Sequence, residues 1–214
     1  MSDNWLTSGG IVALPLFLFS LMAIALILER LIFWFRINNR QQKIVQEILK
    51  IYPNDQPRAL QILRENSTLP IARIFLEALC RDRPNPEAFR LALETATQAE
   101  IPILKRFNTV FETIISVSPL LGLLGTVFGL IRTFAALKIG DIGGSNSGEV
   151  TGGISEALVS TGIGLVVAII TLLFANMFRG FYLRQFAFIQ ESGGQLELLY
   201  RDRYERKRKN LQGH

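Results

Sequence analysis

The sequence contains a single cysteine, Cys80, and a single histidine, His214, which is its last residue. Neither a disulfide within one chain nor a Cys/His metal site can be built from such a set. Catalytic triads and zinc hydrolase sites are excluded for the same reason. We therefore expect no catalytic site, no metal site and no cofactor, and a protein that is not an enzyme.

Charged side chains are missing from three long stretches. Residues 4–28, 113–131 and 157–178 carry no Asp, Glu, Lys or Arg over 25, 19 and 22 residues. An apolar helix crosses a hydrocarbon layer of ~30 Å with about 20 residues, so each stretch predicts a membrane span. The first is too long for a cleaved signal and follows an acidic N-terminus, so we interpret it as a retained span.

Basic residues are unevenly distributed around these spans. Residues 29–106 contain 13 Lys and Arg and residues 179–214 contain 8, whereas 132–153 contains two and the N-terminus none. Cytoplasmic segments collect basic residues, so we expect the N-terminus and the 132–153 loop outside. The same bias accounts for the net charge of +5 without nucleic-acid binding, for which zinc spacing or a basic recognition helix is lacking.

The predicted fold is an all-α membrane protein with three transmembrane helices, the second and third extended into a cytoplasmic helical domain. Short helices are expected over 37–51, 58–65 and 68–80, and "YPNDQP" (52–57) is expected to form a turn between the first two. A long helix from Glu87 lacks a stop signal, so we expect it to bend at Pro102 and continue into the second span. The expected segments are a periplasmic N-terminus (1–10), TM1 (11–35), a cytoplasmic helical domain (36–106), TM2 (107–135), a periplasmic loop (136–153), TM3 (154–178) and a cytoplasmic C-terminal helix and tail (179–214).

Small residues recur every four positions in the second and third spans. Helices in lipid associate through close backbone approach, which favours such residues. The first span is bulky almost all round and is expected to be peripheral. The inner pair then either packs together or lines something central, and its expected packing residues are Pro119, Gly122, Gly125, Gly129 and Gly164, with Ser160 beside them.

Two threonines lie at similar predicted depths in these spans. Thr126 is about nine residues, or ~13 Å, from the outer end of the second span, and Thr161 is about seven residues, or ~10 Å, from the start of the third. Each hydroxyl could simply bond the carbonyl four residues earlier in its own helix. Alternatively, both could form one polar level between helices.

Two carboxylates border the spans. Glu156 lies at the outer mouth of the third span, within two turns of Thr161, and a carboxylate in a span is by default a functional hypothesis. A wetted, interfacial glutamate is the alternative. Glu112 lies seven residues before Pro119 on the inner side, where it could be a pathway residue or could extend into the cytoplasmic interface.

The blocks "SVSPLLGLLGTVFGLIRTF" (116–134) and "GGISEALVSTGIGLVVAIITLLFAN" (152–176) resemble the MotA/TolQ/ExbB family of proton-channel subunits. The layout of three spans extends the resemblance over nearly the whole chain and is more similar to ExbB and TolQ than to the four-span MotA. By motif position, Thr126 and Thr161 correspond to the family's pore-facing threonines, Glu156 to its motif carboxylate and Pro119 to the first residue of the motif. Glu112 and Arg132 depart from the family pattern.

The resemblance implies a homopentamer in the bacterial inner membrane around an ExbD-like or TolR-like single-span partner, whose aspartate takes and gives protons. Thr126, Thr161, Glu156 and Ser160 are then the expected pore-lining residues. Inward proton flow would move the partner and drive a TonB-like periplasmic transducer. A TolQ-like envelope-maintenance role and a non-conducting membrane scaffold are the alternatives.

Overall fold

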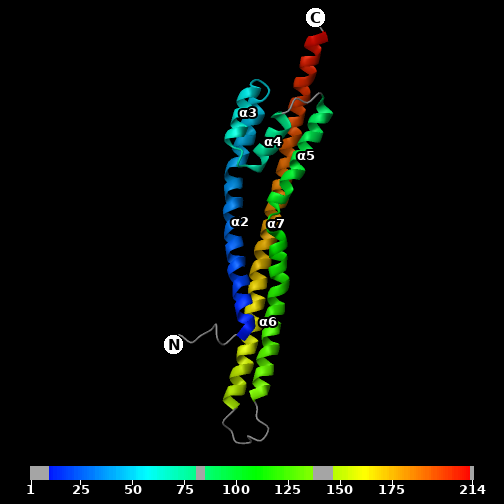
Figure 1. Cartoon of the computed structure of the whole chain (residues 1–214). Coiled ribbons are helices and arrows are strands. Elements are labelled where there is room, and N and C mark those ends of the chain that lie inside the picture. Colours follow the sequence, from blue (N-terminus) through cyan, green and yellow to red (C-terminus); the bar gives the residue numbers. More distant parts are fainter. Residues whose placement is uncertain (1–9, 81–84, 137–146, 213–214) are drawn as a thin grey trace. The chain divides into compact units, whose positions relative to one another are not determined.

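A computed structural model describes residues 10–80, 85–136 and 147–212, and every regular element within them is an α-helix (Figure 1). The helices are α2 (Gly10–Ile51), α3 (Gln56–Glu65), α4 (Pro70–Cys80), α5 (Pro86–Leu104), α6 (Asn108–Ala136) and α7 (Ser147–Gln212). Among the described residues, three helical stretches are long and apolar enough to cross a membrane. They are Ala13–Ile51, Pro86–Ala135 and Thr151–Asn210. The predicted all-α membrane protein with three spanning helices is confirmed.

The helices extend beyond the charge-free stretches to different degrees. α7 is a single helix of 66 residues, so the third span continues without a break into the C-terminal region, as predicted. The expected unbroken helix from Glu87 into the second span is wrong, because a turn at 105–107 separates α5 from α6. Pro102 removes one amide donor from the last turn of α5, and Phe107 has a φ of 68°, a value that ends a right-handed helix.

The described chain divides into two compact units. Unit 1 comprises residues 1–30 and 107–178, and unit 2 comprises residues 31–106 and 179–214. Unit 1 therefore contains the first part of α2, all of α6 and the first part of α7. It holds the charge-free stretches that predicted the three spans.

Unit 1 exposes most of its large apolar side chains. Leu14, Leu120 and Leu173 are each more than 60% exposed, and many neighbours on α2, α6 and α7 are similar. In water such a surface would be unfavourable, but in lipid it costs nothing. A minority of its large apolar side chains are buried. Among them is Phe111, whose ring lies 5.7 Å from that of Phe178.

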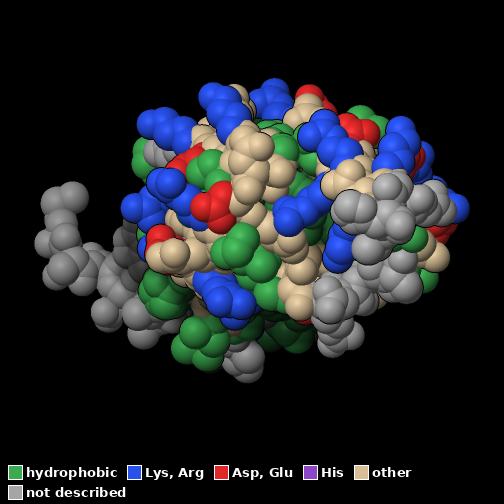
Figure 2. Space-filling view, turned by 90° about the horizontal axis from the view of Figure 1, so that it is seen from above, with side chains coloured by type: hydrophobic (Ala, Val, Ile, Leu, Met, Phe, Trp, Pro, Cys, Tyr) green, Lys and Arg blue, Asp and Glu red, His purple; other side chains and the backbone are tan. Residues whose placement is uncertain are grey.

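Unit 2 has the bulky core expected of a protein in water. Ile48, Phe75 and Phe89 are fully buried, and the rings of Phe89 and Tyr200 stack in parallel with centroids 4.1 Å apart. Lys and Arg side chains are prominent on the face of the molecule seen in Figure 2. Burial of apolar area supplies the main stabilisation of this unit.

Polar contacts define the short helices of unit 2. Asp55 accepts a hydrogen bond from the Arg58 amide (3.0 Å) at the start of α3, and Asn85 accepts one from the Ala88 amide (2.8 Å) at the start of α5. Both side chains satisfy amides that the first helical turn leaves unpaired. The turn predicted for "YPNDQP" accordingly separates α2 from α3.

Candidate functional site

The second and third spans approach each other through glycine. A Cβ added to Gly164 would lie 2.5 Å from the Ser118 carbonyl oxygen and 3.2 Å from Gly122 Cα. A Cβ added to Gly122 would lie 2.9 Å from Thr161 Cα. These distances are shorter than van der Waals contact, so only glycine fits at the crossing of α6 and α7. Gly122 and Gly164 thus lie at the contact of α6 and α7.

A second contact, near the C-terminal end of α6 and the N-terminal end of α7, fixes the register of the two helices. A Cβ on Gly129 would lie 2.8 Å from the Ala157 Cβ, and one on Gly153 would collide with Thr133 Oγ1. α6 and α7 are therefore antiparallel in unit 1, with Ser118 opposite Gly164 and Gly129 opposite Ala157. Gly125 and Pro119 are half-buried on α6.

The register brings the two threonines to neighbouring levels. Thr161 lies opposite Gly122, and Gly122 precedes Thr126 by four residues on α6. Four residues of α-helix rise by about 6 Å. Thr126 and Thr161 are thus about one helical turn apart along the axis and both border the contact between α6 and α7.

Thr126 and Thr161 differ in their hydrogen bonding. The Thr126 hydroxyl donates to the Leu123 carbonyl at 2.6 Å, three residues earlier instead of the four that the simple alternative assumed. Thr161 Oγ1 is buried and has no hydrogen-bond partner among the described residues. The interpretation of a self-satisfied threonine therefore applies to Thr126 and not to Thr161.

Thr161 belongs to a group of three buried hydroxyls. Ser118 is fully buried and Ser160 is 9% exposed, and the hydroxyls of both lack a partner among the described residues, as that of Thr161 does. All three residues surround the crossing of Gly122 and Gly164. A buried hydroxyl without a partner costs about 1–3 kcal/mol, so this group, here called the hydroxyl cluster, is suited to accept a water molecule or a polar group from another chain.

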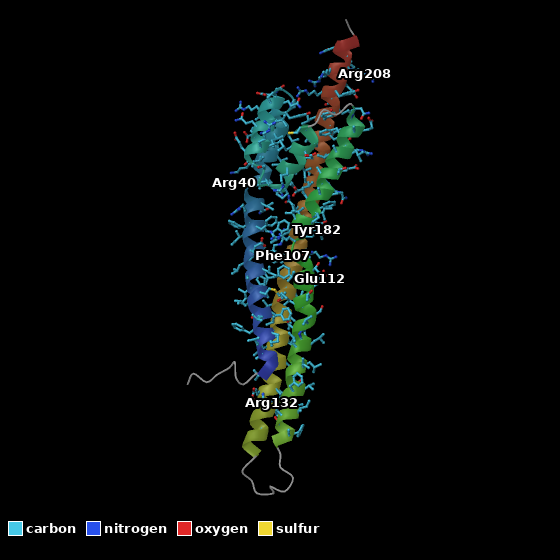
Figure 3. All side chains as sticks on the ribbon, viewed as in Figure 1. Arg40, Phe107, Glu112, Arg132, Tyr182 and Arg208 are labelled. Atoms are coloured by element: carbon cyan, nitrogen blue, oxygen red, sulfur yellow. The ribbon has the colours of Figure 1, made fainter. Side chains whose placement is uncertain are left out.

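The charged candidates lie away from the hydroxyl cluster. Glu156 and Glu112 are both exposed, as is Arg132. Figure 3 shows Glu112 and Arg132 on α6, well separated along the helix. Glu156 and Thr161 are five residues apart on α7, which rotates their side chains by about 140° about the helix axis. Within one chain they do not share a face, so a path using both would involve more than one copy.

Two polar positions of this contact were not singled out as site residues by sequence reasoning. Ser118 is one of the small residues of the second span, and its hydroxyl belongs to the hydroxyl cluster. Thr171 is fully buried on α7, and its hydroxyl donates to the Val167 carbonyl at 2.7 Å. Spacing alone does not distinguish a serine that is free to bind from a threonine satisfied by its own helix.

Comparison with known proteins covers most of the chain. Residues 66–191 match the model of the MotA/TolQ/ExbB proton channel family. The putative biopolymer transport protein ExbB-like 3 of Synechocystis sp. is 62% identical over 194 residues, covering 91% of this chain and 92% of that protein. ExbB-like 1 of the same organism is 40% identical, covering 91% and 77%. The Tol-Pal system protein TolQ of Haemophilus influenzae is 38% identical over 40% of this chain and 36% of its own length.

Proposed function

Because the chain belongs to the MotA/TolQ/ExbB proton channel family, we propose that it is the ring-forming subunit of an ExbB–ExbD-type motor driven by the proton-motive force. Several copies, five by the family resemblance, surround the membrane helices of an ExbD-like or TolR-like partner in the inner membrane. The N-terminus is periplasmic and the C-terminus cytoplasmic. Inward proton flow then performs work on a TonB-like periplasmic transducer.

The observation that carries this proposal is the hydroxyl cluster. Ser118, Ser160 and Thr161 bury hydroxyls that no described group satisfies, in a unit whose outer surface is apolar. Such hydroxyls can hydrogen-bond to water or to an acid brought by a partner helix. In this proposal the chain supplies the polar wall, and the partner's aspartate supplies the titrating group.

Glu156 and Thr126 complete the proposed path. Glu156 is exposed near the start of α7. In this proposal that end of the third span faces the periplasm, so Glu156 would attract protons entering from outside. Thr126 donates to its own helix, but its oxygen keeps lone pairs that can accept a further hydrogen bond. A proton that binds the partner's aspartate near these hydroxyls would remove its negative charge. The aspartate would then contact a different copy of this chain, and the partner would move within the ring. Glu112 is a possible inner-side outlet on the same chain.

The test compares three threonine variants of nearly the same shape. Proton uptake is measured in liposomes that contain the full chain and its ExbD-like partner. Thr161→Val should lower the uptake rate at least tenfold, and Thr161→Ser should retain most of it. Thr171→Val is the matched control, because the Thr171 hydroxyl is already satisfied within α7, and it should leave uptake unchanged.

Two outcomes would contradict the proposal. If Thr161→Val conducts as well as the wild type, the hydroxyl has no part in the path. If the wild type with its partner takes up no protons although the complex forms, the chain is the non-conducting scaffold. A TolQ-like role is distinguished in cells, where loss of the gene would cause envelope leakage instead of loss of transducer-dependent uptake.

A further inference from the structure

A groove in unit 2 combines aromatic walls with a polar end. It lies between α2 and α7, has a volume of about 380 Å³, and is lined by ten residues of these two helices. Its aromatic lining residues are Trp34, Phe35, Phe181 and Phe188, while Asn38 and Arg184 are among its polar groups. A volume in this range is typical of a site for a small molecule or for part of a larger amphipathic one.

The two walls of the groove run parallel. The rings of Trp34 and Phe181 lie 5.8 Å apart, and the side-chain amides of Gln41 and Gln185 exchange two hydrogen bonds of 2.5 and 2.6 Å. Residue numbers therefore increase in the same direction on both helices.

This parallel register gives the groove a polarity gradient. Along α2, the lining changes from Leu31 and Phe35 to Asn38 and Gln42. On α7, Arg184 and Gln185 follow Phe181, and Phe188 lies one turn further along the helix. The α2 wall of the groove is thus apolar toward Leu31 and polar toward Gln42, and the α7 wall places Arg184 beside this polar part.

The charge around the groove has one sign. Residues 31–46 and 179–190 contain five basic residues and no Asp or Glu. None of the five makes an ion pair with another described residue, and Arg184 is exposed at the groove itself. The five are Arg36, Arg40, Lys43, Arg179 and Arg184. Such a site is complementary to an anion.

Trp34 adds an unused donor to the groove wall. The residue is 6% exposed, and its Nε1 has no hydrogen-bond partner among the described residues. A buried indole N–H normally finds an acceptor. Because the Trp34 ring lines the groove, a small shift of the ring would bring this N–H to an oxygen of an occupant.

We propose that this groove binds one anionic phospholipid of the surrounding membrane. The phosphate lies at Arg184, with Asn38 as a further donor, and a glycerol ester oxygen accepts from Trp34 Nε1. The upper methylene groups of the acyl chains contact Phe35 and Phe181. A basic groove between membrane helices on the cytoplasmic side is a known type of lipid headgroup site, and its size admits the headgroup region and not the whole lipid.

The first experiment measures lipid retention by the purified full chain without its partner, using native mass spectrometry after exchange into detergent with phosphatidylglycerol or phosphatidylcholine. The wild type should retain one phosphatidylglycerol and little phosphatidylcholine. Arg184→Gln should reduce this retention at least fivefold, and Trp34→Phe by a smaller factor. Arg208→Gln is the matched control, because Arg208 is also exposed on α7 but lies 24 residues further along the helix.

A second experiment locates the bound lipid. In a Trp5→Phe background Trp34 is the only tryptophan, and its fluorescence is excited at a wavelength that tyrosine does not absorb. Phosphatidylglycerol brominated on the upper acyl chain should quench this fluorescence more than brominated phosphatidylcholine at equal mole fraction. Arg184→Gln should abolish that preference, with circular dichroism confirming that the variant is folded.

Three results would overturn the proposal. Equal loss of retention in Arg184→Gln and Arg208→Gln would indicate a diffuse electrostatic attraction. Equal retention of the two lipids would exclude recognition of the anionic headgroup, and absence of any retained lipid would exclude the site. All these measurements are made without the ExbD-like partner, so they do not depend on proton flow.

Discussion

The two units of the molecule pack their helices with opposite kinds of side chain. Unit 1 brings backbones together at Gly122 and Gly164 and leaves its large apolar side chains outside. Unit 2 buries Phe75 and Phe89 and orders its short helices with caps and an ion pair. The difference follows from the solvent, because lipid gives apolar side chains no reason to be buried, whereas water does. The same chain thus follows two sets of packing rules.

The largest effect is expected where unit 1 depends on glycine. Gly164→Ala places a methyl group 2.5 Å from the Ser118 carbonyl oxygen, so the helices must separate at a cost of about 2–3 kcal/mol. Gly162→Ala is the matched control, since a Cβ there meets nothing within 4 Å. Denaturant unfolding in detergent should show a large decrease in the free energy of unfolding for Gly164→Ala and no decrease for Gly162→Ala. Equal effects would mean that close packing does not hold this unit.

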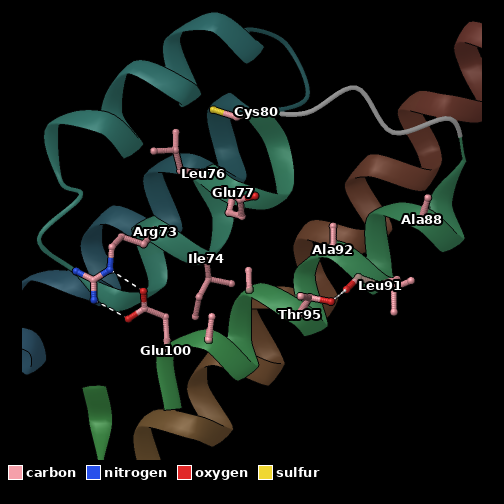
Figure 4. A pocket seen from close by; sticks show the side chains of 12 residues that line it. Arg73, Ile74, Leu76, Glu77, Cys80, Ala88, Leu91, Ala92, Thr95 and Glu100 are labelled. Carbon is pink, nitrogen blue, oxygen red and sulfur yellow. Dashed lines mark hydrogen bonds and ion pairs between the residues drawn. The ribbon is translucent and has the colours of Figure 1, made fainter. Parts of the chain in front are cut away.

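In unit 2 the strongest polar contact is the ion pair of Arg73 and Glu100 (Figure 4). Two hydrogen bonds of 2.6 Å join the side chains, and they raise the pKa of the Arg73 guanidinium. Arg73→Ala leaves the Glu100 carboxylate, which is 10% exposed, without its partner. We expect a loss of about 2 kcal/mol in the free energy of unfolding, less than for a fully buried pair because Arg73 is one third exposed.

The control for this prediction is another pair in the same unit. Arg90 and Glu94 are 61% and 60% exposed and lie 3.8 Å apart, so Arg90→Ala should change stability by less than about 0.5 kcal/mol. A similar loss from both variants would show that burial does not decide the strength of these pairs.

A smaller effect is expected at the caps that shape unit 2. Asn85→Ala removes the acceptor for the Ala88 amide and should cost about 1 kcal/mol. Asn85→Asp keeps an acceptor and should restore most of the loss. Thermal unfolding followed by circular dichroism measures both variants, and an alanine variant as stable as the wild type would contradict the role of the cap.

The last effect concerns Tyr52, is absent at neutral pH and emerges only at high pH. Burial raises the pKa of the Tyr52 phenol from 10.0 to about 12, with nearby Arg203 opposing the shift and Tyr200 adding to it. Between these values the unfolded chain loses the phenol proton while the folded chain keeps it. The free energy of unfolding therefore falls as pH rises from about 10 to about 12.

Tyr52→Phe isolates this contribution from other titrating groups. Unfolding curves of the two proteins, measured at several pH values from 9 to 12 in detergent, should run parallel below pH 10 and diverge above it, the wild type losing more stability. Curves that stay parallel to pH 12 would show that the phenol is not protected by burial.

The helical architecture could be predicted from the sequence because hydropathy and charge act over many residues. Hydropathy and charge, summed over many residues, predict the three spanning helices and the continuation of the third span into the C-terminal region. The turn after Ile51 follows from the turn-forming residues of that segment. The turn after Leu104 could not be foreseen, since Pro102 is compatible with a bend as well as an end. Phe107 gives no signal of a positive φ, which usually belongs to glycine or asparagine.

The sequence indicates which residues form the candidate site, but it does not indicate which atoms their side chains contact. Small-residue spacing marks one face on each of the two spans, because that spacing repeats with the helix, and Gly122 and Gly164 lie at the contact of α6 and α7. The partner of each hydroxyl depends on a single rotamer, so sequence could not distinguish Thr126, which donates to Leu123, from Thr161, which does not donate. The roles of Thr161, Glu156 and Glu112 in proton flow remain predictions.

The reciprocal amide pair of Gln41 and Gln185 has a consequence for a member of a proton channel family. Both side chains are buried, and each donates one hydrogen bond and accepts one from the other. An amide neither gains nor loses a proton in the physiological range. A carboxylate or histidine at this position would loosen or tighten the junction of α2 and α7 whenever the surrounding pH fell. With two glutamines, that junction keeps the same strength while the acidity around it varies.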